Sequence, residues 1–396
     1  MALDFQQIRE QVSQLGENAP RREQRLQELR QQACILLESN AHRIEDLRLK
    51  VQDVVRSHDP SLRCALPIAE ALNAHFRLPE LREPITILAA DGSQIAPDRH
   101  AEVQFCVINV GAVQMCLGSS EPTVTRVMSR LYYDEDLYTA TGTITDATLA
   151  LRRDFHERLM LADLAGHTPP PVITFTDGPM ELWGGKVGEG EEASEFRKSL
   201  AAYTQVLSNL YELQVTTAGY VDKPGANLVL RLLEVAQTPE EELADIRKRH
   251  PLRGVSDFDL FYDLLEVGER SAVFAIQSQS AKSYTGPLAL HFFYLNVGRQ
   301  GHPWLARVEI PAWVAKSPRM LDDLHAVLIH QCRTLGSRPY PYLLHRAHET
   351  ALVSLQEKEQ ITTMITLELR RRGVKVGEKS YKQAAKDLSS RARYEG

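Results

Sequence analysis

The chain has 396 residues, a formal net charge of −6 and 43% hydrophobic residues, which is typical of a globular protein with one large domain or two. The negative charge excludes an open, non-specific nucleic-acid binder, because such proteins carry a surplus of Lys and Arg. The five cysteines are scattered without a CxxC pair, which excludes a disulfide framework and a zinc cluster. We find no secretory leader and no apolar run of membrane-spanning length, so we expect a cytoplasmic protein with no membrane contact.

The first eighty residues are predicted to be helical. Residues 21–55 are rich in Gln, Glu, Arg and Leu, and their apolar residues recur at steps of three and four. This pattern fits a helical hairpin or a helix that pairs with another subunit. We therefore expect an N-terminal helical segment at residues 1–83.

Strand-like segments begin after Pro84. They are β-branched or aromatic runs bounded by Gly, Pro or Asp, at residues 85–91, 101–113, 172–178, 211–222, 272–277, 288–298 and 305–314. Helical patterns lie between them at residues 146–166, 194–212 and 321–336. This order predicts an α/β fold at residues 84–360, a mixed β-sheet flanked by helices, followed by a helical and basic tail at residues 361–396.

Two of the predicted strands end in Asp-Gly, at Asp91-Gly92 and at Asp177-Gly178. Asp-Gly is a common turn dipeptide, so two unrelated turns are one interpretation. If the strands are neighbours, however, both carboxylates emerge at the same edge of the sheet, where ligands bind in α/β proteins. Two carboxylates held close together repel unless a cation neutralises them, and their hard oxygens suit Mg²⁺ or Mn²⁺.

Two further groups of polar residues are candidates. Glu157 lies on the predicted helix among three arginines, where an exposed ion pair is its ordinary role. Tyr340 precedes a second helix that carries His345 and His348, three positions apart and on one face. A tyrosine and a histidine beside a metal site could contact a phosphate or move a proton, but a helix start with solvent-facing histidines is equally compatible.

Taken in this order, the motifs resemble those of the NurA nucleases, from about Pro84 to Leu355. The resemblance rests on Asp-Gly-Ser at the first strand, an arginine-rich helix with a Glu, a second Asp-Gly strand, and a late "YP" followed by "AH". It assigns metal-binding and catalytic roles to Asp91 and Asp177, catalytic roles to Glu157, Tyr340 and His348, and a contact with substrate phosphate to Lys223.

The resemblance also implies an RNase H-like core and a homodimer. The implied activity is manganese-dependent, or else magnesium-dependent, cleavage of DNA. It would be a 5′-to-3′ exonuclease on single- and double-stranded DNA and an endonuclease on single strands, acting with the hexameric ATPase HerA in DNA end resection and repair. The alternative is a non-catalytic NurA-like dimer that serves as partner or scaffold of the ATPase. A nucleotide-binding enzyme is disfavoured because the sequence has no Walker A motif and no Rossmann glycine fingerprint.

Overall fold

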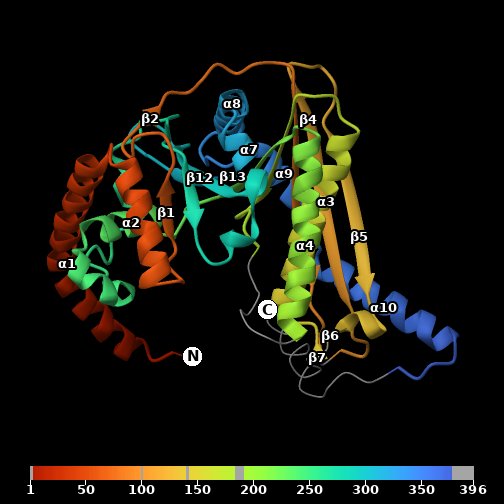
Figure 1. Cartoon of the computed structure of the whole chain (residues 1–396). Coiled ribbons are helices and arrows are strands. Elements are labelled where there is room, and N and C mark those ends of the chain that lie inside the picture. Colours follow the sequence, from red (N-terminus) through yellow and green to blue (C-terminus); the bar gives the residue numbers. More distant parts are fainter. Residues whose placement is uncertain (1–2, 100, 140–141, 183–190, 377–396) are drawn as a thin grey trace. The chain divides into compact units, whose positions relative to one another are not determined.

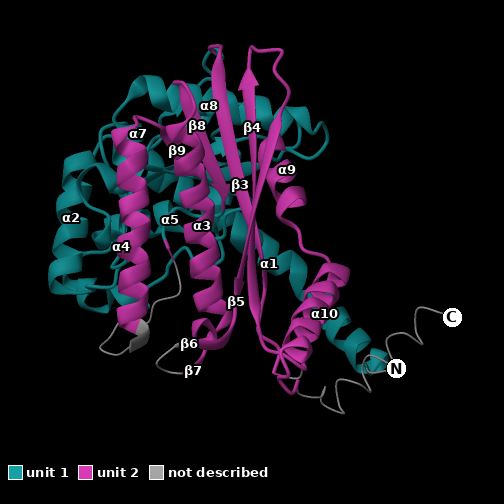
Figure 2. Ribbon diagram, turned by 90° about the vertical axis from the view of Figure 1, so that its right-hand side faces the viewer, with its two compact units in different colours: residues 1–81, 178–181, 218–340 teal, residues 82–177, 182–217, 341–396 magenta. Residues whose placement is uncertain are grey.

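The computed structural model describes residues 3–99, 101–139, 142–182 and 191–376 (Figure 1). The chain forms two compact units that interleave along the sequence (Figure 2). Unit 1 comprises residues 1–81, 178–181 and 218–340, and unit 2 comprises residues 82–177, 182–217 and 341–396. Each unit contains its own group of paired strands.

In unit 1 the strands pair antiparallel. Their order is β1 (Cys64–Pro67), β11 (Phe274–Gln277), β12 (Leu290–Asn296), β13 (Leu305–Pro311) and the second half of β9 (Thr216–Val221). Two short strands, β2 (His75–Phe76) and β10 (Arg270–Ser271), pair with each other, and β10 also pairs with β12. Every residue of β12 and β13 is buried, as expected of strands covered on both faces.

The helices of unit 1 are α1 (Phe5–Asn40), α2 (Ile44–Ser57), α5 (Leu228–Gln237), α6 (Asp257–Tyr262), α7 (Ala312–Ala315) and α8 (Pro318–Thr334). Three 3-10 helices, η2 (Glu240–Lys248), η3 (Ala281–Ser283) and η4 (Gly286–Leu288), connect them to the strands. The predicted N-terminal helices are confirmed by α1 and α2, but β1 and β2 show that the prediction of helix over all the first eighty residues was wrong. Both strands are short and depend on pairing with distant segments, which local residue patterns do not report.

The start of α5 is fixed by a buried carboxylate from α6. Asp257 is fully buried and accepts hydrogen bonds from the backbone N–H groups of Val229 (2.9 Å) and Leu230 (2.8 Å) and from the hydroxyl of Tyr294 (2.6 Å). Ser256 caps α6 in a reciprocal capping box with Asp259. These three hydrogen-bond donors offset the free-energy cost of burying the Asp257 carboxylate.

In unit 2, β3 (Ile85–Ile95), β4 (Cys106–Leu117) and β5 (Val124–Tyr132) form an antiparallel meander. After η1 (Asp134–Leu137) and the short hairpin of β6 (Tyr138–Thr139) and β7 (Gly142–Thr143), the helix α3 (Asp146–Gly166) leads to β8 (Val172–Asp177). β8 pairs parallel with β3, so the order is β5-β4-β3-β8. This order and these directions are those of an RNase H-like core, which confirms the predicted fold class.

Helices cover both faces of the unit 2 strands. Figure 2 shows α3 and α4 (Glu191–Glu212) on one side of β3 and α9 (Tyr342–Ala351) on the other. The alternation of side chains along β3 agrees, since Ser93 donates to the carbonyl of Ala351 in α9 (2.5 Å) whereas Gly92 faces α3. The last described helix, α10 (Leu355–Arg371), packs Ile361 and Ile365 on the apolar end of the meander.

The predicted domain boundary at residue 360 falls within α10. Of the predicted tail at residues 361–396, the part after residue 376 lies outside the described residues. Among the described helices none is both long and apolar enough to cross a membrane. All five cysteines are free thiols, as the sequence predicts.

The structure also corrects the predicted end of the first strand after Pro84. β3 does not end at Asp91: it continues through Gly92 to Ile95 and stays paired with β4 throughout. The second Asp-Gly pair is a genuine strand end, because β8 stops at Asp177 and Gly178 has a φ of +86°, a conformation that favours glycine. Asp91 therefore lies inside a long strand, beside the point at which its neighbour ends.

Candidate active site

The pairing of β3 with β8 brings Asp91 and Asp177 to the same level. The last pair in the parallel register is Ala90 with Thr176, and the two aspartates follow directly. Residues at the same level on neighbouring strands point to the same face of the sheet, so both carboxylates lie on the face that carries α9. The condition under which the sequence places both carboxylates at one edge of the sheet, that the two strands are neighbours, is met.

His348 reaches this face from α9 and bonds to the first aspartate. The Nδ1 atom of His348 donates to Asp91 Oδ2 (2.6 Å), and the backbone N–H of Gly92 donates to Oδ1 (2.8 Å). With Nδ1 bound to the carboxylate, Nε2 is the nitrogen that can accept a proton. The His348 side chain is 59% exposed, so a substrate can approach it.

The close approach of α9 depends on a glycine. Gly111 lies opposite Asp91 in the β3–β4 register, and a Cβ there would lie 2.7 Å from the backbone nitrogen of Ala351 and 2.9 Å from the carbonyl oxygen of Ala347. Any other residue at position 111 would push α9, and His348 with it, away from the strand.

On the opposite face of β3, Gly92 allows an equally close approach of α3. A Cβ at Gly92 would lie 2.7 Å from Glu157 Oε1 and 2.6 Å from Arg153 Cγ, both on α3. Glu157 is only 5% exposed, so its ordinary role as an exposed helical ion-pair partner is excluded. Its Oε1 atom lies 3.3 Å from Arg153 Nε. The glycine thus serves close packing at a strand interior rather than a turn.

Negative charge accumulates around Glu157. Burial raises the pKa of Glu157 well above its usual range, and the carboxylates of Asp154 and Asp91 raise it further against the opposing effect of Arg153. Burial also raises the pKa of Asp154. Since three carboxylates lie within electrostatic reach of one another, an added cation would stabilise their ionised forms.

Sequence reasoning missed the role of Arg158, a buried arginine of α3 beside the site. Arg158 is 1% exposed and donates to the hydroxyls of Thr176 (2.5 Å) and Thr217 (3.1 Å). Thr176 directly precedes Asp177, so the hydrogen bond from Arg158 on α3 holds the end of β8 in place. The arginine-rich sequence of α3 was visible, but the burial of one arginine depends on the tertiary packing of α3.

The donor set fits a hard divalent cation. Asp91, Asp177 and Glu157 offer carboxylate oxygens, the ligands that Mg²⁺ and Mn²⁺ prefer. Among the residues described by the structure, no three Asp, Glu, His or Cys side chains are already grouped as a metal cage. On α3, Arg153 pairs with Glu157 and with the neighbouring Asp154.

Two predicted site residues belong to unit 1, whereas the acids and His348 belong to unit 2. Tyr340 lies eight positions before His348 in the chain. Its ring packs edge-on against the ring of Tyr220, with 5.7 Å between the ring centres. Lys223 follows β9 with a φ of +45°, in the left-handed region that a lysine rarely adopts. Its Nζ atom lies 5.9 Å from the ring centre of Trp304.

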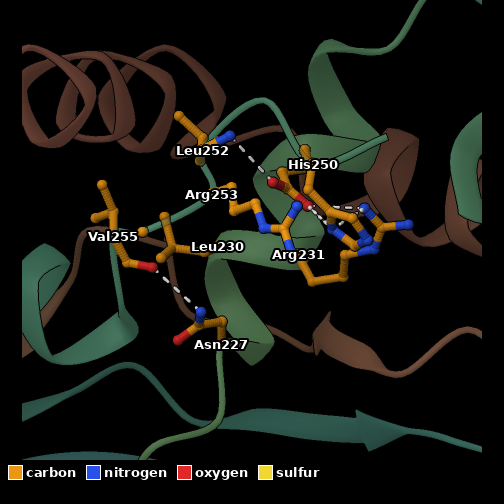
Figure 3. A pocket seen from close by; sticks show the side chains of 9 residues that line it. Asn227, Leu230, Arg231, His250, Leu252, Arg253 and Val255 are labelled. Atoms are coloured by element: carbon orange, nitrogen blue, oxygen red, sulfur yellow. Dashed lines mark hydrogen bonds and ion pairs between the residues drawn. The ribbon is translucent and has the colours of Figure 1, made fainter. Parts of the chain in front are cut away.

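Unit 1 also contains a cavity of about 370 Å³ beside α5 (Figure 3). Its polar lining is largely bonded to itself: Arg231 donates to Glu234 (2.7 Å), and Glu234 accepts from the backbone N–H of Leu252 (3.1 Å). None of the predicted site residues lines this cavity. The arrangement has the character of a structural network.

A family model described as the NurA domain matches residues 85–353. The chain belongs to the NurA family. The matched part contains every predicted site residue, and α1, α2 and α10 lie outside it. No curated sequence matches the chain.

Three solved structures illustrate the likeness. The NurA nuclease from Sulfolobus solfataricus is 12% identical over 85% of this chain and 95% of its own, with a TM-score of 0.49. A structure of NurA with manganese is 10% identical over 89% and 98%, with a TM-score of 0.37. The catalytic domain of human Endonuclease V is 16% identical over 82% and 98%, with a TM-score of 0.32. The family assignment rests on the sequence match.

Proposed function

We propose that this NurA-family protein is a metal-dependent deoxyribonuclease, with Mn²⁺ or Mg²⁺ as its cofactor. The observation that carries the proposal is the placement of Asp91: it lies level with Asp177 at the end of β8 and accepts a hydrogen bond from His348. In a chain of this family, two carboxylates and an oriented imidazole on one face suit phosphodiester hydrolysis.

Asp91 and Asp177 would hold the cation, and Glu157, which approaches Gly92 from the face of α3, would add its negative charge. When bound, the cation would neutralise charge on the phosphate and lower the pKa of water. The residues of the chain have the other roles. His348, held by Asp91 through Nδ1, would take a proton from the attacking water at Nε2. Tyr340 would donate its hydroxyl to a phosphate oxygen, and Lys223 would bind a phosphate of the substrate.

By membership of the family we extend the proposal to substrate and partners. The activity would be 5′-to-3′ exonuclease on single- and double-stranded DNA and endonuclease on single strands. The protein would act as a cytoplasmic homodimer with a HerA-type hexameric ATPase in DNA end resection and repair. The first half of α1 supports an assembly role: Phe5, Ile8, Val12 and Leu15 are 60%, 42%, 60% and 68% exposed at steps of three and four.

The test is cleavage of a 5′-labelled oligonucleotide by the full chain, with Mn²⁺ and with a chelator. We expect cleavage only with metal, and a loss of about a thousandfold in Asp91→Asn and Asp177→Asn, equivalent to about 4 kcal/mol of transition-state stabilisation. Asp163→Asn, an exposed change on α3, is the matched control and should retain the wild-type rate.

Wild-type rates in either aspartate variant would remove the proposed metal ligands. Absence of cleavage by the wild type with metal, both alone and with the ATPase, would instead favour the non-catalytic scaffold.

A further inference from the structure

We propose that Arg153 is an internal cation that neutralises an acidic cluster, formed by Asp154 and Glu157 beside Asp91, until a divalent metal ion displaces it. The inference rests on the proposed function, because it concerns the same metal. Arg153 Nη2 lies 2.9 Å from Asp154 Oδ1, and its Nε lies 3.3 Å from Glu157 Oε1. One guanidinium therefore binds two of the carboxylates near Asp91.

The strand fixes the position of this arginine. The Cγ and Cδ atoms of Arg153 would lie 2.6 Å and 3.0 Å from a Cβ at position 92, so the stem of the side chain lies directly over Gly92. Asp91 is the next residue along the strand and interacts favourably with the guanidinium through its charge. The absence of a side chain at position 92 thus gives Arg153 its place in the cluster.

A metal and the guanidinium would compete for the same oxygens. Asp154 Oδ1 already accepts two N–H groups of Arg153, from Nε (3.3 Å) and Nη2 (2.9 Å). Hard cations bind such oxygens directly, and two positive groups at one carboxylate repel each other. A metal that binds Asp154 or Glu157 therefore requires Arg153 to release that carboxylate. The Arg153 side chain is 32% exposed, so it can turn towards solvent without unpacking the helix.

The inference also brings Asp154 into the site. It precedes Glu157 by three positions on α3, so the two carboxylates share one face of the helix. With Arg153 displaced, Asp154 becomes an additional acid beside the metal.

The neighbouring arginine provides a matched control. Arg152 lies 3.2 Å from Glu195 and donates to the carbonyl of Asp136 (3.4 Å), so it binds neither acid of the cluster. Removing it changes the net charge by the same amount, one position away, without freeing Asp154 or Glu157. Any difference between the two variants reports the contacts of Arg153 rather than a general change in charge.

The experiment is calorimetric titration of the DNA-free, full-length protein with Mn²⁺, together with thermal unfolding in chelator. The variants are Arg153→Met, which keeps an apolar stem over Gly92, Arg153→Gln as a second substitution, and Arg152→Met. We expect about tenfold tighter Mn²⁺ binding in both Arg153 variants, a typical size for coupling between two ligands. We also expect a lower unfolding temperature without metal, and a change of less than about threefold in Arg152→Met.

Unchanged or weaker Mn²⁺ binding in the Arg153 variants, with normal binding by the wild type, would overturn this inference and leave the nuclease proposal intact. Equal tightening in Arg152→Met would overturn it as well, because the effect would then be one of net charge. Failure of the wild type and every variant to bind Mn²⁺ would overturn the inference and the metal-dependent function together.

Discussion

Both units bury carboxylates, but they partner them differently. In unit 1, Asp257 accepts three hydrogen bonds from two backbone N–H groups and a tyrosine hydroxyl. Glu309, also fully buried, pairs with Arg307 and accepts the backbone N–H of Met180 (2.9 Å). In unit 2, Glu157 pairs with the guanidinium of Arg153, whereas the negative charges of Asp154 and Asp91 raise the pKa of Glu157.

An acid that serves the fold can be distinguished by its partners from an acid that is proposed to bind a cation. Burial alone does not separate them, since Asp257 and Glu157 are both buried. A structural acid is surrounded by donors that cannot leave, whereas Asp154 and Glu157 repel each other around the guanidinium of Arg153, a side chain that can move. Such unrelieved repulsion, which raises the pKa of a carboxyl group, is a property of sites that await a cation.

The comparison predicts that removing an acid from unit 1 acts on stability. Asp257→Ala would leave the N–H groups of Val229 and Leu230 and the hydroxyl of Tyr294 buried without a partner. We expect a loss of about 4 kcal/mol in the free energy of unfolding, measured by denaturant titration. The nuclease activity per folded molecule would not change. A loss below about 1 kcal/mol would show that these donors find other partners.

Unit 1 is also predicted to respond to pH through a buried histidine. His325 is 1% exposed, its Nε2 donates to the carbonyl of Gly268 (2.7 Å), and burial lowers its pKa to about 4. The unfolded chain binds a proton near pH 6.5 and the folded chain does not, so stability is lost as the pH falls from 6.5 to 4. The loss amounts to about 3 kcal/mol over that window.

His325→Gln keeps a donor for Gly268 but cannot titrate, so its stability is expected to vary less over the same window in denaturant titrations at several pH values. An identical pH profile for the variant and the wild type would show that another group is responsible.

Substitutions of the two proposed catalytic groups that are not acids are predicted to act on the rate of cleavage. His348→Ala, and Tyr340→Phe in unit 1, each remove a group assigned to the phosphate or the attacking water, and we expect cleavage about a hundredfold slower in either. Manganese affinity, read by calorimetry, would change little. His345→Ala, on the same helix and paired with Glu349 at 3.5 Å, is the control. Loss of manganese binding in His348→Ala would make the imidazole a metal ligand instead.

The smallest expected effect is on the stability of Glu157→Gln without metal. The substitution removes a buried charge and also the ion pair with Arg153, so the two changes oppose each other. We expect the free energy of unfolding to change by about 1 kcal/mol or less, while manganese affinity falls. A loss comparable to that of Asp257→Ala would place Glu157 among the structural acids.

The sequence predicted much of this arrangement, because the signals were local. Runs of β-branched residues indicated β3 and β8. The Asp-Gly pair that follows the apolar residues in each strand indicated where the two carboxylates lie. The two strands proved to be neighbours, and the α/β class followed from the order of the elements. Tyr340 and His348 were candidates from the residue pattern, and the family resemblance added Lys223; the roles of all three stay predictions.

What the sequence did not show depends on tertiary contacts. Gly92 has the sequence signature of a turn, yet it is a strand glycine that makes room for α3. β5 was missed because it is an edge strand with exposed, arginine-bearing residues that lack an apolar alternation. The burial of Arg158 and the pairing of Arg153 with two acids follow from how α3 lies on the strands, which no local pattern reports.

Thermal unfolding of the full chain with and without Mn²⁺ tests directly whether the acids of unit 2 form a cation site. A bound ion at a hundredfold excess over its dissociation constant stabilises a protein by about 2.7 kcal/mol, so the wild type and the control Asp163→Asn are expected to unfold at a higher temperature with Mn²⁺. Asp91→Asn is expected to gain nothing. Equal stabilisation of Asp91→Asn and the wild type would show that Asp91 does not belong to a cation site.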